Sequence, residues 1–282
     1  MKGIDVSTRQ GTINWQRVAA SGIEFAMVKA TQGRGEGLTT KHLRRFTDSK
    51  FKHNIVNATA AGIPCGVYHY MTAQNLSEAE DEADYFCDVI APYRDKITLW
   101  AAVDVESVPY LRVLDRERLT AITRRFMDVV KIRGYKPMLY TNPDHISYRF
   151  MPNAFYGDEI WLAHWTEGNH MDVPNLRIWQ YGATGNQHDV KKGWATMADG
   201  RIPGINAACD VNEGYFEIAK PAEPSYKVGG KYTIKTGDVY KYSNGSEKPV
   251  PKSLCDGKHT YTISKVEPGR ILLREIMSWV KI

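Results

Sequence analysis

The sequence predicts an α/β fold, an irregular TIM-like (β/α) barrel that is followed by a small all-β domain. Three observations predict it. Eight short runs rich in β-branched and aromatic residues alternate with helical patterns over about 215 residues, as in a parallel barrel. A segment with two prolines and no apolar periodicity then interrupts the chain. The remaining residues form only short alternating runs separated by turn signals, which is typical of small β-domains.

The expected barrel strands are apolar runs bounded by turn residues, at 3–7, 24–29, 66–71, 99–105, 137–141, 160–164, 177–181 and 208–211. Helical patterns cover 41–61, 77–90 and 115–134, and a short helix is expected from Pro143. Ser77 and Glu80 have the spacing of a capping box, Asp115 suits an N-cap, and Gly134 suits the position after a helix end. Between residues 160 and 211 the chain is too polar for full-length crossover helices, so we expect an irregular last third.

The domain boundaries follow from the prolines. Residues 219–226 are expected to form a semi-rigid linker between a barrel domain at 1–218 and a small β-domain at 227–282. Asn244-Gly245 is a type I′ turn signal, and Pro268-Gly269 marks another turn. The expected strands of the second domain are 231–235, 238–242, 260–265, 270–274 and 278–282.

Composition bounds the class of protein. Hydrophobic residues make up 43% and charged residues 24%, as in soluble globular proteins. No apolar run reaches the roughly 18–20 residues that would span a bilayer. The chain begins directly with a strand pattern and shows no signal-peptide apolar region, so we expect synthesis in the cytoplasm or a mature, processed chain. The four cysteines form no C-x-x-C pair, and we expect reduced thiols, no metal site and no cofactor.

The net charge of +5 is confined to the end of the chain. Residues 221–282 carry 11 Lys and Arg against 6 Asp and Glu, whereas residues 1–220 carry 26 of each. This asymmetry predicts an anionic partner for the second domain. The domain lacks a dense basic run or a recognition-helix pattern, so we expect a polyanionic surface and no nucleic acid.

Candidate catalytic residues lie at the ends of the expected strands. Asp104 and Glu106 end an apolar run, and residues two apart on a strand point to one side, roughly 6–7 Å apart. Taken alone, two acidic residues separated by one residue at a strand end are more often a pair of solvated acids. In a barrel, however, the carboxyl ends of the strands converge, and paired carboxylates there suit glycoside hydrolysis. The polar and aromatic residues at those ends are Asp5, Lys29, Tyr68, Tyr70, Asp104, Glu106, Tyr140, Asn142, Trp165, Gln180 and Asp210.

A series of motifs carries a family resemblance across residues 3–216. They are Gly3-Ile-Asp-Val-Ser7, Gln10-Gly11, Ile13-Asn-Trp15, Phe25-Ala-Met-Val-Lys-Ala-Thr31, Val67-Tyr-His-Tyr70, Val103-Asp-Val-Glu106, Tyr140-Thr-Asn-Pro143, Ile160-Trp-Leu-Ala-His-Trp165, Ile178-Trp-Gln-Tyr181 and Cys209-Asp-Val-Asn212. In this order they resemble glycoside hydrolase family 25, the Chalaropsis-type lysozymes, which include many bacteriophage endolysins. Gln32 departs from the common family pattern, in which glutamate is frequent.

The resemblance implies muramidase activity, the cleavage of the β-1,4 bond between N-acetylmuramic acid and N-acetylglucosamine in peptidoglycan. By the same resemblance Glu106 is the general acid, Asp104 stabilises charge on the sugar or orients its 2-acetamido group, and Asp5 and Asp210 support the pair. Repulsion among carboxylates in one cleft should keep one of them protonated near neutral pH. The spacing does not decide between retention and inversion of the anomeric centre.

Aromatic residues are expected to bind the sugars. Tyr68, Tyr70, Tyr140 and Trp165 would line a groove because sugar rings stack on aromatic faces, and Gln180 would hydrogen-bond a sugar hydroxyl. Packing inside the barrel is the alternative for each of them. His69 lies out of phase with the inward-facing residues, so we expect it to pack against helices.

The second domain resembles, in placement and composition, the Src-homology-3-like wall-binding domains at the ends of endolysins. It would hold the enzyme on an anionic cell-wall polymer and raise the local substrate concentration. An endolysin would be made in the host cytoplasm and released by a holin or by lysis. Two other hypotheses stay open at this point. The protein could be a catalytically inactive glycan-binding protein, or a glycosidase of another N-acetylated glycan such as chitin.

Overall fold

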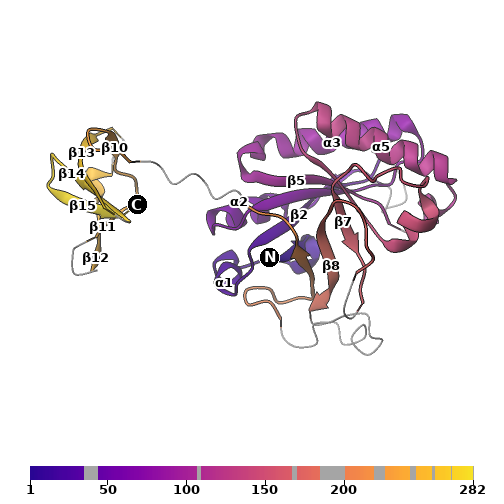
Figure 1. The fold of residues 1–282 in the computed structure, drawn as a ribbon, viewed down its shortest axis with the longest axis horizontal. Coiled ribbons are helices and arrows are strands. Elements are labelled where there is room, and N and C mark those ends of the chain that lie inside the picture. The colour runs from indigo at the N-terminus through magenta and orange to yellow at the C-terminus, as the bar shows by residue number, and fades with distance from the viewer. Residues whose placement is uncertain are drawn as a thin grey trace. The chain divides into compact units, whose positions relative to one another are not determined.

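The computed structural model describes residues 1–34, 44–106, 109–166, 170–184, 201–218, 226–241, 246–255, 258–267 and 269–281. The chain forms two compact units, Met1–Glu217 and Ile218–Ile282 (Figure 1). Most of the expected linker at 219–226, the Asn244-Gly245 turn and Pro268 lie outside the described residues. Every helix in the described part of the chain is too short or too polar to span a lipid bilayer.

The described residues of the first unit form a closed barrel, which confirms the predicted α/β barrel. β1 (Lys2–Val6) pairs with both β9 (Cys209–Gly214) and β2 (Phe25–Gln32), which closes the ring, and β3 (Phe46–Thr47) adds to β2 outside it. Around the ring the strands are β1 (Lys2–Val6), β9 (Cys209–Gly214), β8 (Leu176–Thr184), β7 (Ile160–Ala163), β6 (Pro137–Thr141), β5 (Ile97–Asp104), β4 (Cys65–Tyr70) and β2 (Phe25–Gln32).

The last strand of the barrel runs against the others. β9 is antiparallel to both β8 and β1, whereas the remaining neighbours in the ring are parallel. The prediction that Asp210 ends a parallel strand is therefore wrong. Asp210 is the second residue of β9, and β9 begins at the end of the barrel where β8 finishes. An antiparallel strand needs no crossover helix, which agrees with the polar connection before it.

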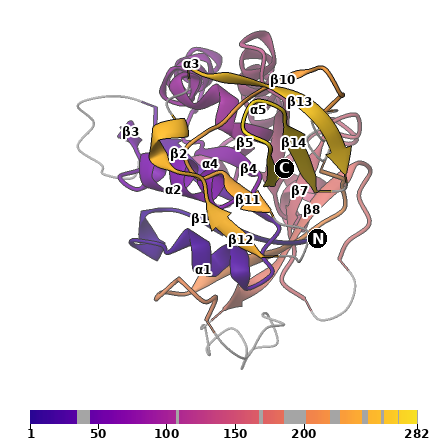
Figure 2. The same cartoon turned by 90° about the vertical axis from the view of Figure 1, so that its left-hand side faces the viewer.

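Helices cover part of the outside of the barrel. In the first unit they are α1 (Trp15–Ala20), α2 (Phe51–Ala60), α3 (Leu76–Ile90), α4 (Pro109–Arg112) and α5 (Arg116–Ile132), with short helical turns η1 (Thr8–Gln10), η2 (Ala91–Lys96) and η3 (His145–Arg149). In Figures 1 and 2, α1 and α2 lie outside β1 and β2, and α3 lies beside α5. The described residues between β7 and β8 and before β9 form no helix, while residues 185–200 lie outside the described part; the irregularity that is seen in the last third is the antiparallel β9.

Helix ends follow local chemistry. Asp115 caps α5 by accepting a hydrogen bond from the Arg118 N–H, and Gly134, with φ of 81°, follows the helix end; both were predicted. The predicted capping box at Ser77 is wrong, because α3 begins at Leu76 and Asn75, two residues before Ser77, caps it by accepting from the Glu78 N–H. The helix predicted over 41–61 is confirmed as α2 (Phe51–Ala60) but is wrong at its start, since Phe46–Thr47 pair with β2.

Aromatic rings fill the spaces that these elements leave. Phe86 of α3 and Phe126 of α5 are fully buried with ring centroids 5.8 Å apart, and burial of each side chain contributes on the order of 1.5–3 kcal/mol. At the end of the barrel where β1 and β2 begin, Phe216 packs edge-on against Phe25 and Trp100. A Cβ atom at Gly3 would lie 2.1 Å from the Phe25 ring, so this position needs glycine.

The second unit is a small β-structure with its own core. Its strands pair in the order β10 (Lys231–Thr233), β13 (Thr260–Glu267), β14 (Arg270–Leu273), β15 (Ser278–Lys281), β11 (Val239–Lys241) and β12 (Glu247–Pro249), with a helical turn η4 (Lys252–Leu254). β12 was not predicted from the sequence, because it is exposed along its length and carries no apolar alternation. The core residues are Ile234, Val250, Tyr261, Ile263, Ile271, Leu273 and Val280.

Candidate active site

Four acidic side chains meet at one end of the barrel and are called the acid cluster below: Asp5, Asp104, Glu106 and Asp210. They come from β1, from the end of β5 and the residue two beyond it, and from the start of β9. Asp5 lies opposite Asp210 in the β1–β9 register. Glu106 interacts electrostatically with Asp104, and Asp5 with all three other acids. The structure thus brings together the acids that the sequence placed at separate strand ends.

Asp5 is held by donors that favour its ionised form. Its Oδ2 accepts hydrogen bonds from Gln180 Nε2 at 3.0 Å and from Asn212 Nδ2 at 2.8 Å. Burial raises the pKa of Asp5, and these two hydrogen bonds together with one from Asp210 oppose that rise. Because Asp5 has three donors facing it, we infer that it is the anion of the Asp5–Asp210 pair.

Hydrogen bonds to their side-chain oxygens fix the orientation of the Asn212 and Gln180 amides. Asn212 Oδ1 accepts from Trp161 Nε1 at 2.8 Å, and Gln180 Oε1 accepts from Tyr140 Oη at 3.0 Å and from Trp165 Nε1 at 2.9 Å. Each amide oxygen is therefore occupied by donors, and each amide nitrogen is left to face Asp5. Gln180, Tyr140 and Trp165 were predicted to contact sugar. The structure gives them a second task, since they position Asp5.

Asp210 is the protonated partner. Burial, repulsion from Asp5 and Glu106, and its hydrogen bond to Asp5 raise the pKa of Asp210 to about 8. At neutral pH its carboxyl group therefore carries a proton and donates it in that hydrogen bond. Asp5 and Asp210 hold one negative charge between them instead of two.

Asp104 has an oxygen without a partner. The side chain is 5% exposed, and its Oδ1 is buried with no hydrogen-bond partner among the described residues. Burial and the charge of Glu106 raise the pKa of Asp104 well above its ordinary value, while Lys29 opposes the rise. A buried polar atom that is left unpaired costs free energy, so this oxygen is poised for a donor that arrives with a ligand.

Glu106 is the acid best placed to give up a proton. Burial raises its pKa, the charge of Asp5 adds to the rise, and Lys29 and Arg9 oppose it. Unlike Asp5 and Asp104, the Glu106 side chain keeps partial solvent exposure. A carboxylic acid whose pKa is raised and that can reach a ligand is what general acid catalysis requires.

Lys29 lies beside the acid cluster, and its position in the sequence predicted only that it stands at a strand end. Its Nζ donates to Gln32 Oε1 at 2.7 Å and lies 4.8 Å from the centroid of the Tyr70 ring. Burial lowers its pKa, and the charges of Asp104, Asp48 and Glu106 oppose that fall. The signal was present in the sequence, because one lysine interrupts an otherwise buried strand. Lys29 supplies a positive charge beside the acid cluster.

The aromatic candidates fall into two groups. Tyr140 is 8% exposed and packs edge-on against Trp161, with ring centroids 4.5 Å apart. Tyr68, Tyr70 and Trp165 are partly exposed at the same end of the barrel. Tyr70 and Tyr140 come from the strands on either side of Asp104, directly beside it in register. Sugar contact by these rings stays a prediction, with Tyr140 the least accessible.

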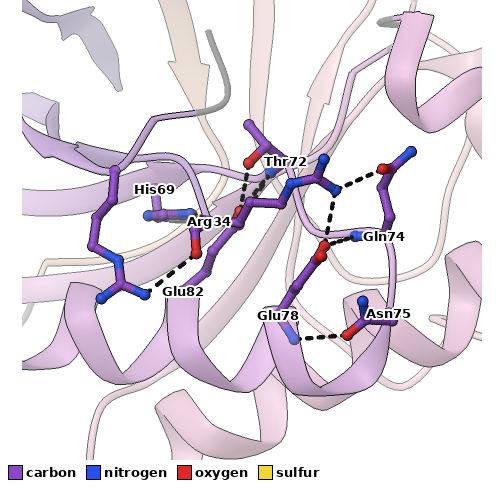
Figure 3. A network of polar contacts seen from close by, with 8 residues as sticks. Arg34, His69, Thr72, Gln74, Asn75, Glu78 and Glu82 are labelled. Carbon is purple, nitrogen blue, oxygen red and sulfur yellow. Dashed lines mark hydrogen bonds and ion pairs between the residues drawn. The ribbon is translucent and has the colours of Figure 1, made fainter. Parts of the chain in front are cut away.

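His69 lies between the two tyrosines of β4 and points the other way, as predicted from strand alternation. It is fully buried, and its Nε2 lies 2.8 Å from Glu82 Oε2 while its Nδ1 lies 2.7 Å from Thr31 Oγ1. Glu82 also accepts from the N–H and hydroxyl of Thr72 (Figure 3). This buried network joins α3 to β2 and β4, the strands that carry Lys29 and Tyr70.

Comparisons with known proteins place these features in a family. Residues 4–190 match the model of "Glycosyl hydrolases family 25". The chain is 30% identical over 197 residues to Lysozyme M1 of Streptomyces globisporus, covering 66% of this chain and 63% of that protein. It is 28% identical over 216 residues to the autolytic lysozyme of Clostridium acetobutylicum, covering 76% of this chain and 55% of that protein. The chain thus spans less than two thirds of the length of these two relatives.

A solved structure has the same fold. The bacterial lysozyme from Streptomyces coelicolor superposes with a TM-score of 0.60 at 25% identity, covering 78% of this chain and 94% of that one. The family match covers more than half of the chain and includes Asp5, Asp104 and Glu106. The chain belongs to glycosyl hydrolase family 25.

Proposed function

We propose that this protein is a muramidase, a peptidoglycan hydrolase that cleaves the β-1,4 bond between N-acetylmuramic acid and N-acetylglucosamine. One observation carries the proposal: Glu106, an acid whose pKa is raised, sits two residues after Asp104, whose buried Oδ1 has no partner among the described residues. The family and the names of the two lysozyme relatives support it.

Glu106 acts as the general acid in this proposal. It gives its proton to the glycosidic oxygen, the C–O bond breaks, and the leaving sugar departs with a new hydroxyl group. A water molecule then adds to the anomeric carbon and returns a proton to the Glu106 carboxylate. Each turnover is therefore neutral in protons and needs no cofactor.

Asp104 faces the sugar that becomes positively charged. Its free Oδ1 either accepts the N–H of the 2-acetamido group, which orients that group toward the anomeric carbon, or stabilises charge on the ring. Asp5, kept anionic by Gln180 and Asn212, adds a fixed negative charge behind them. The anomeric configuration of the first product, read by proton NMR, decides between retention and inversion.

Mass spectrometry of digested peptidoglycan tests the proposal. After borohydride reduction, a muramidase leaves muramitol at the new chain ends, whereas cleavage of the other glycosidic bond leaves glucosaminitol. Wall binding without any new reducing end would instead indicate an inactive glycan-binding protein. Faster cleavage of chitin oligomers than of peptidoglycan would indicate a different glycan as the substrate.

We also propose that the second unit binds an anionic cell-wall polymer. Residues 221–282 carry the whole net charge of +5. On one face of the unit, Arg270 lies 4.3 Å and Lys265 5.7 Å from the ring centroid of Trp279, which is partly exposed. Binding of the full chain to native walls should exceed binding to walls stripped of anionic polymers, and should weaken as salt is raised.

An endolysin role follows from joining these two units, a wall-cleaving barrel and a wall-binding tail. Such a protein would be made in the cytoplasm of a phage-infected host and reach the wall through a holin or on lysis. Expression in a bacterium with a sensitive wall tests this. Lysis that requires a co-expressed holin supports the role, and lysis by the protein alone contradicts it.

A further inference from the structure

Arg9 stands at the rim of the acid cluster on a fixed turn. It lies in η1, which directly follows the strand that carries Asp5. Gln10 Nε2 donates to the carbonyl of Ala208 at 2.8 Å, two residues before Asp210, and the Thr8 N–H donates to Asp48 Oδ2 at 2.9 Å. The backbone of Arg9 is therefore held from both sides, while its side chain is exposed.

The Arg9 guanidinium has no carboxylate partner among the described residues. Its charge nevertheless reaches the acid cluster, since it lowers the pKa of Glu106 and of Asp210. Five arginines of the first unit instead form ion pairs with carboxylates, namely Arg34, Arg124, Arg125, Arg133 and Arg177. Arg9 thus acts on Glu106 and Asp210 through its charge without an ion pair to either of them, and its five donors are available to a ligand.

The proposed substrate carries the matching group. Every second sugar of the glycan is a muramic acid, whose lactyl ether ends in a carboxyl group that is free or joined to a peptide with carboxylates of its own. Chitin has the same backbone and the same acetamido groups but no carboxylate. A guanidinium recognises a carboxylate through two parallel hydrogen bonds, which gives both affinity and geometry.

We propose that Arg9 is a subsite for a substrate carboxylate, carried by the muramic acid lactyl group or by its stem peptide, and that it favours peptidoglycan over chitin. This inference rests on the proposed function, because it names the part of that substrate which Arg9 contacts. Arg9 touches a side group and not the reacting bond, so its contribution is to binding.

Binding measurements on a non-hydrolysing background test it. In full-length Glu106→Gln protein, with and without Arg9→Gln, calorimetry measures the affinity for three soluble ligands. They are a peptidoglycan tetrasaccharide with stem peptides, the same tetrasaccharide after amidase treatment, which frees the lactyl carboxylate, and chitotetraose. Arg9→Gln should weaken binding of a carboxylate ligand about five- to tenfold, the size of one charged hydrogen-bonded contact, and change chitotetraose binding less than about twofold.

Comparison of the two carboxylate ligands shows which carboxylate of the substrate Arg9 binds. Weakening only for the amidase-treated ligand identifies the lactyl carboxylate, and weakening only for the peptide-bearing ligand identifies a carboxylate of the stem peptide. Weakening for both shows that Arg9 accepts either carboxylate. Arg9→Lys should retain part of the affinity, and Arg17→Gln, which removes an exposed arginine from α1, should change none of the three. Equal weakening for all three ligands, or none for either carboxylate ligand, overturns the proposal. Because no turnover is measured, these outcomes are independent of which bond the enzyme cleaves.

Discussion

Asp5 and Asp210 lie directly opposite each other on β1 and β9, and their carboxyl groups share a hydrogen bond. Burial and the neighbouring acids raise the pKa of Asp210 to about 8, so that it is the donor and Asp5 the acceptor near neutral pH. A strand that runs against the rest of the barrel makes this pairing possible. The pair adds one negative charge, not two, beside the residues that are proposed to act on the sugar.

Asp210 links the stability of the first unit to pH. Its pKa is higher in the folded than in the unfolded chain, so unfolding releases its proton between about pH 4 and 8, and its contribution to stability falls as the pH rises through that window. Asp210→Asn keeps a donor toward Asp5 without an ionisable group. We expect the variant to be more stable than the wild type at pH 8, on the order of 2 kcal/mol, and the gap to close toward pH 4. Denaturant unfolding at both pH values measures this, and a gap that is constant with pH would contradict it.

Lys29 should set the pH range of activity. Its positive charge lowers the pKa of both Asp104 and Glu106, so Lys29→Met should raise both. The pH–activity profile on a soluble glycan is then expected to move to higher pH by on the order of one unit. Gln32→Glu places an anion on the atom that Lys29 Nζ contacts at 2.7 Å, so it should move the profile in the same direction by less. A profile that stays in place, or moves to lower pH, would show that Lys29 does not act through its charge.

The buried network around Glu82 should be a stability element. Glu82→Ala leaves the His69 ring and the Thr72 N–H buried without their acceptor, and we expect it to lower the free energy of unfolding of the first unit by about 3–5 kcal/mol. Glu82→Gln keeps an acceptor oxygen and should cost about 1–3 kcal/mol. Glu80→Gln on the same helix breaks a solvent-exposed pair with Arg125 and should cost at most about 1 kcal/mol. If Glu82→Ala cost no more than Glu80→Gln, the network would not hold α3 to the barrel.

Much of the barrel could be predicted from sequence because its signals are local. Short apolar runs marked all eight strands of the ring, and Asp115 and Gly134 marked the ends of α5. The direction of β9 was not predicted, because the apolar pattern of a short strand does not indicate whether it runs parallel or antiparallel to its neighbours. The start of α2 was missed because Phe46 and Thr47 sit within a helical pattern but find a partner in β2. In both cases pairing with a distant strand decided the outcome.

The candidate site, like the barrel, could be predicted from the sequence only in part. The four acids could be found from their positions at strand ends, although Asp210 reaches the site from the opposite direction. The orientation of Asp5 by Gln180 and Asn212, and of these amides by Tyr140, Trp165 and Trp161, depends on contacts between residues up to 207 positions apart. No sequence pattern encodes which amide atom faces a carboxylate. The unpartnered oxygen of Asp104 is likewise visible only once its surroundings are known.

The most direct test is the rate at which Glu106→Gln releases muramic acid reducing ends from purified peptidoglycan, compared with the wild type at equal protein concentration. Glutamine preserves the shape of the side chain, so circular dichroism and thermal unfolding should show a folded protein. We predict a loss of about 10³-fold, the size of a general acid contribution, with wall binding retained. A folded Glu106→Gln protein that releases muramic acid ends at the wild-type rate would contradict it.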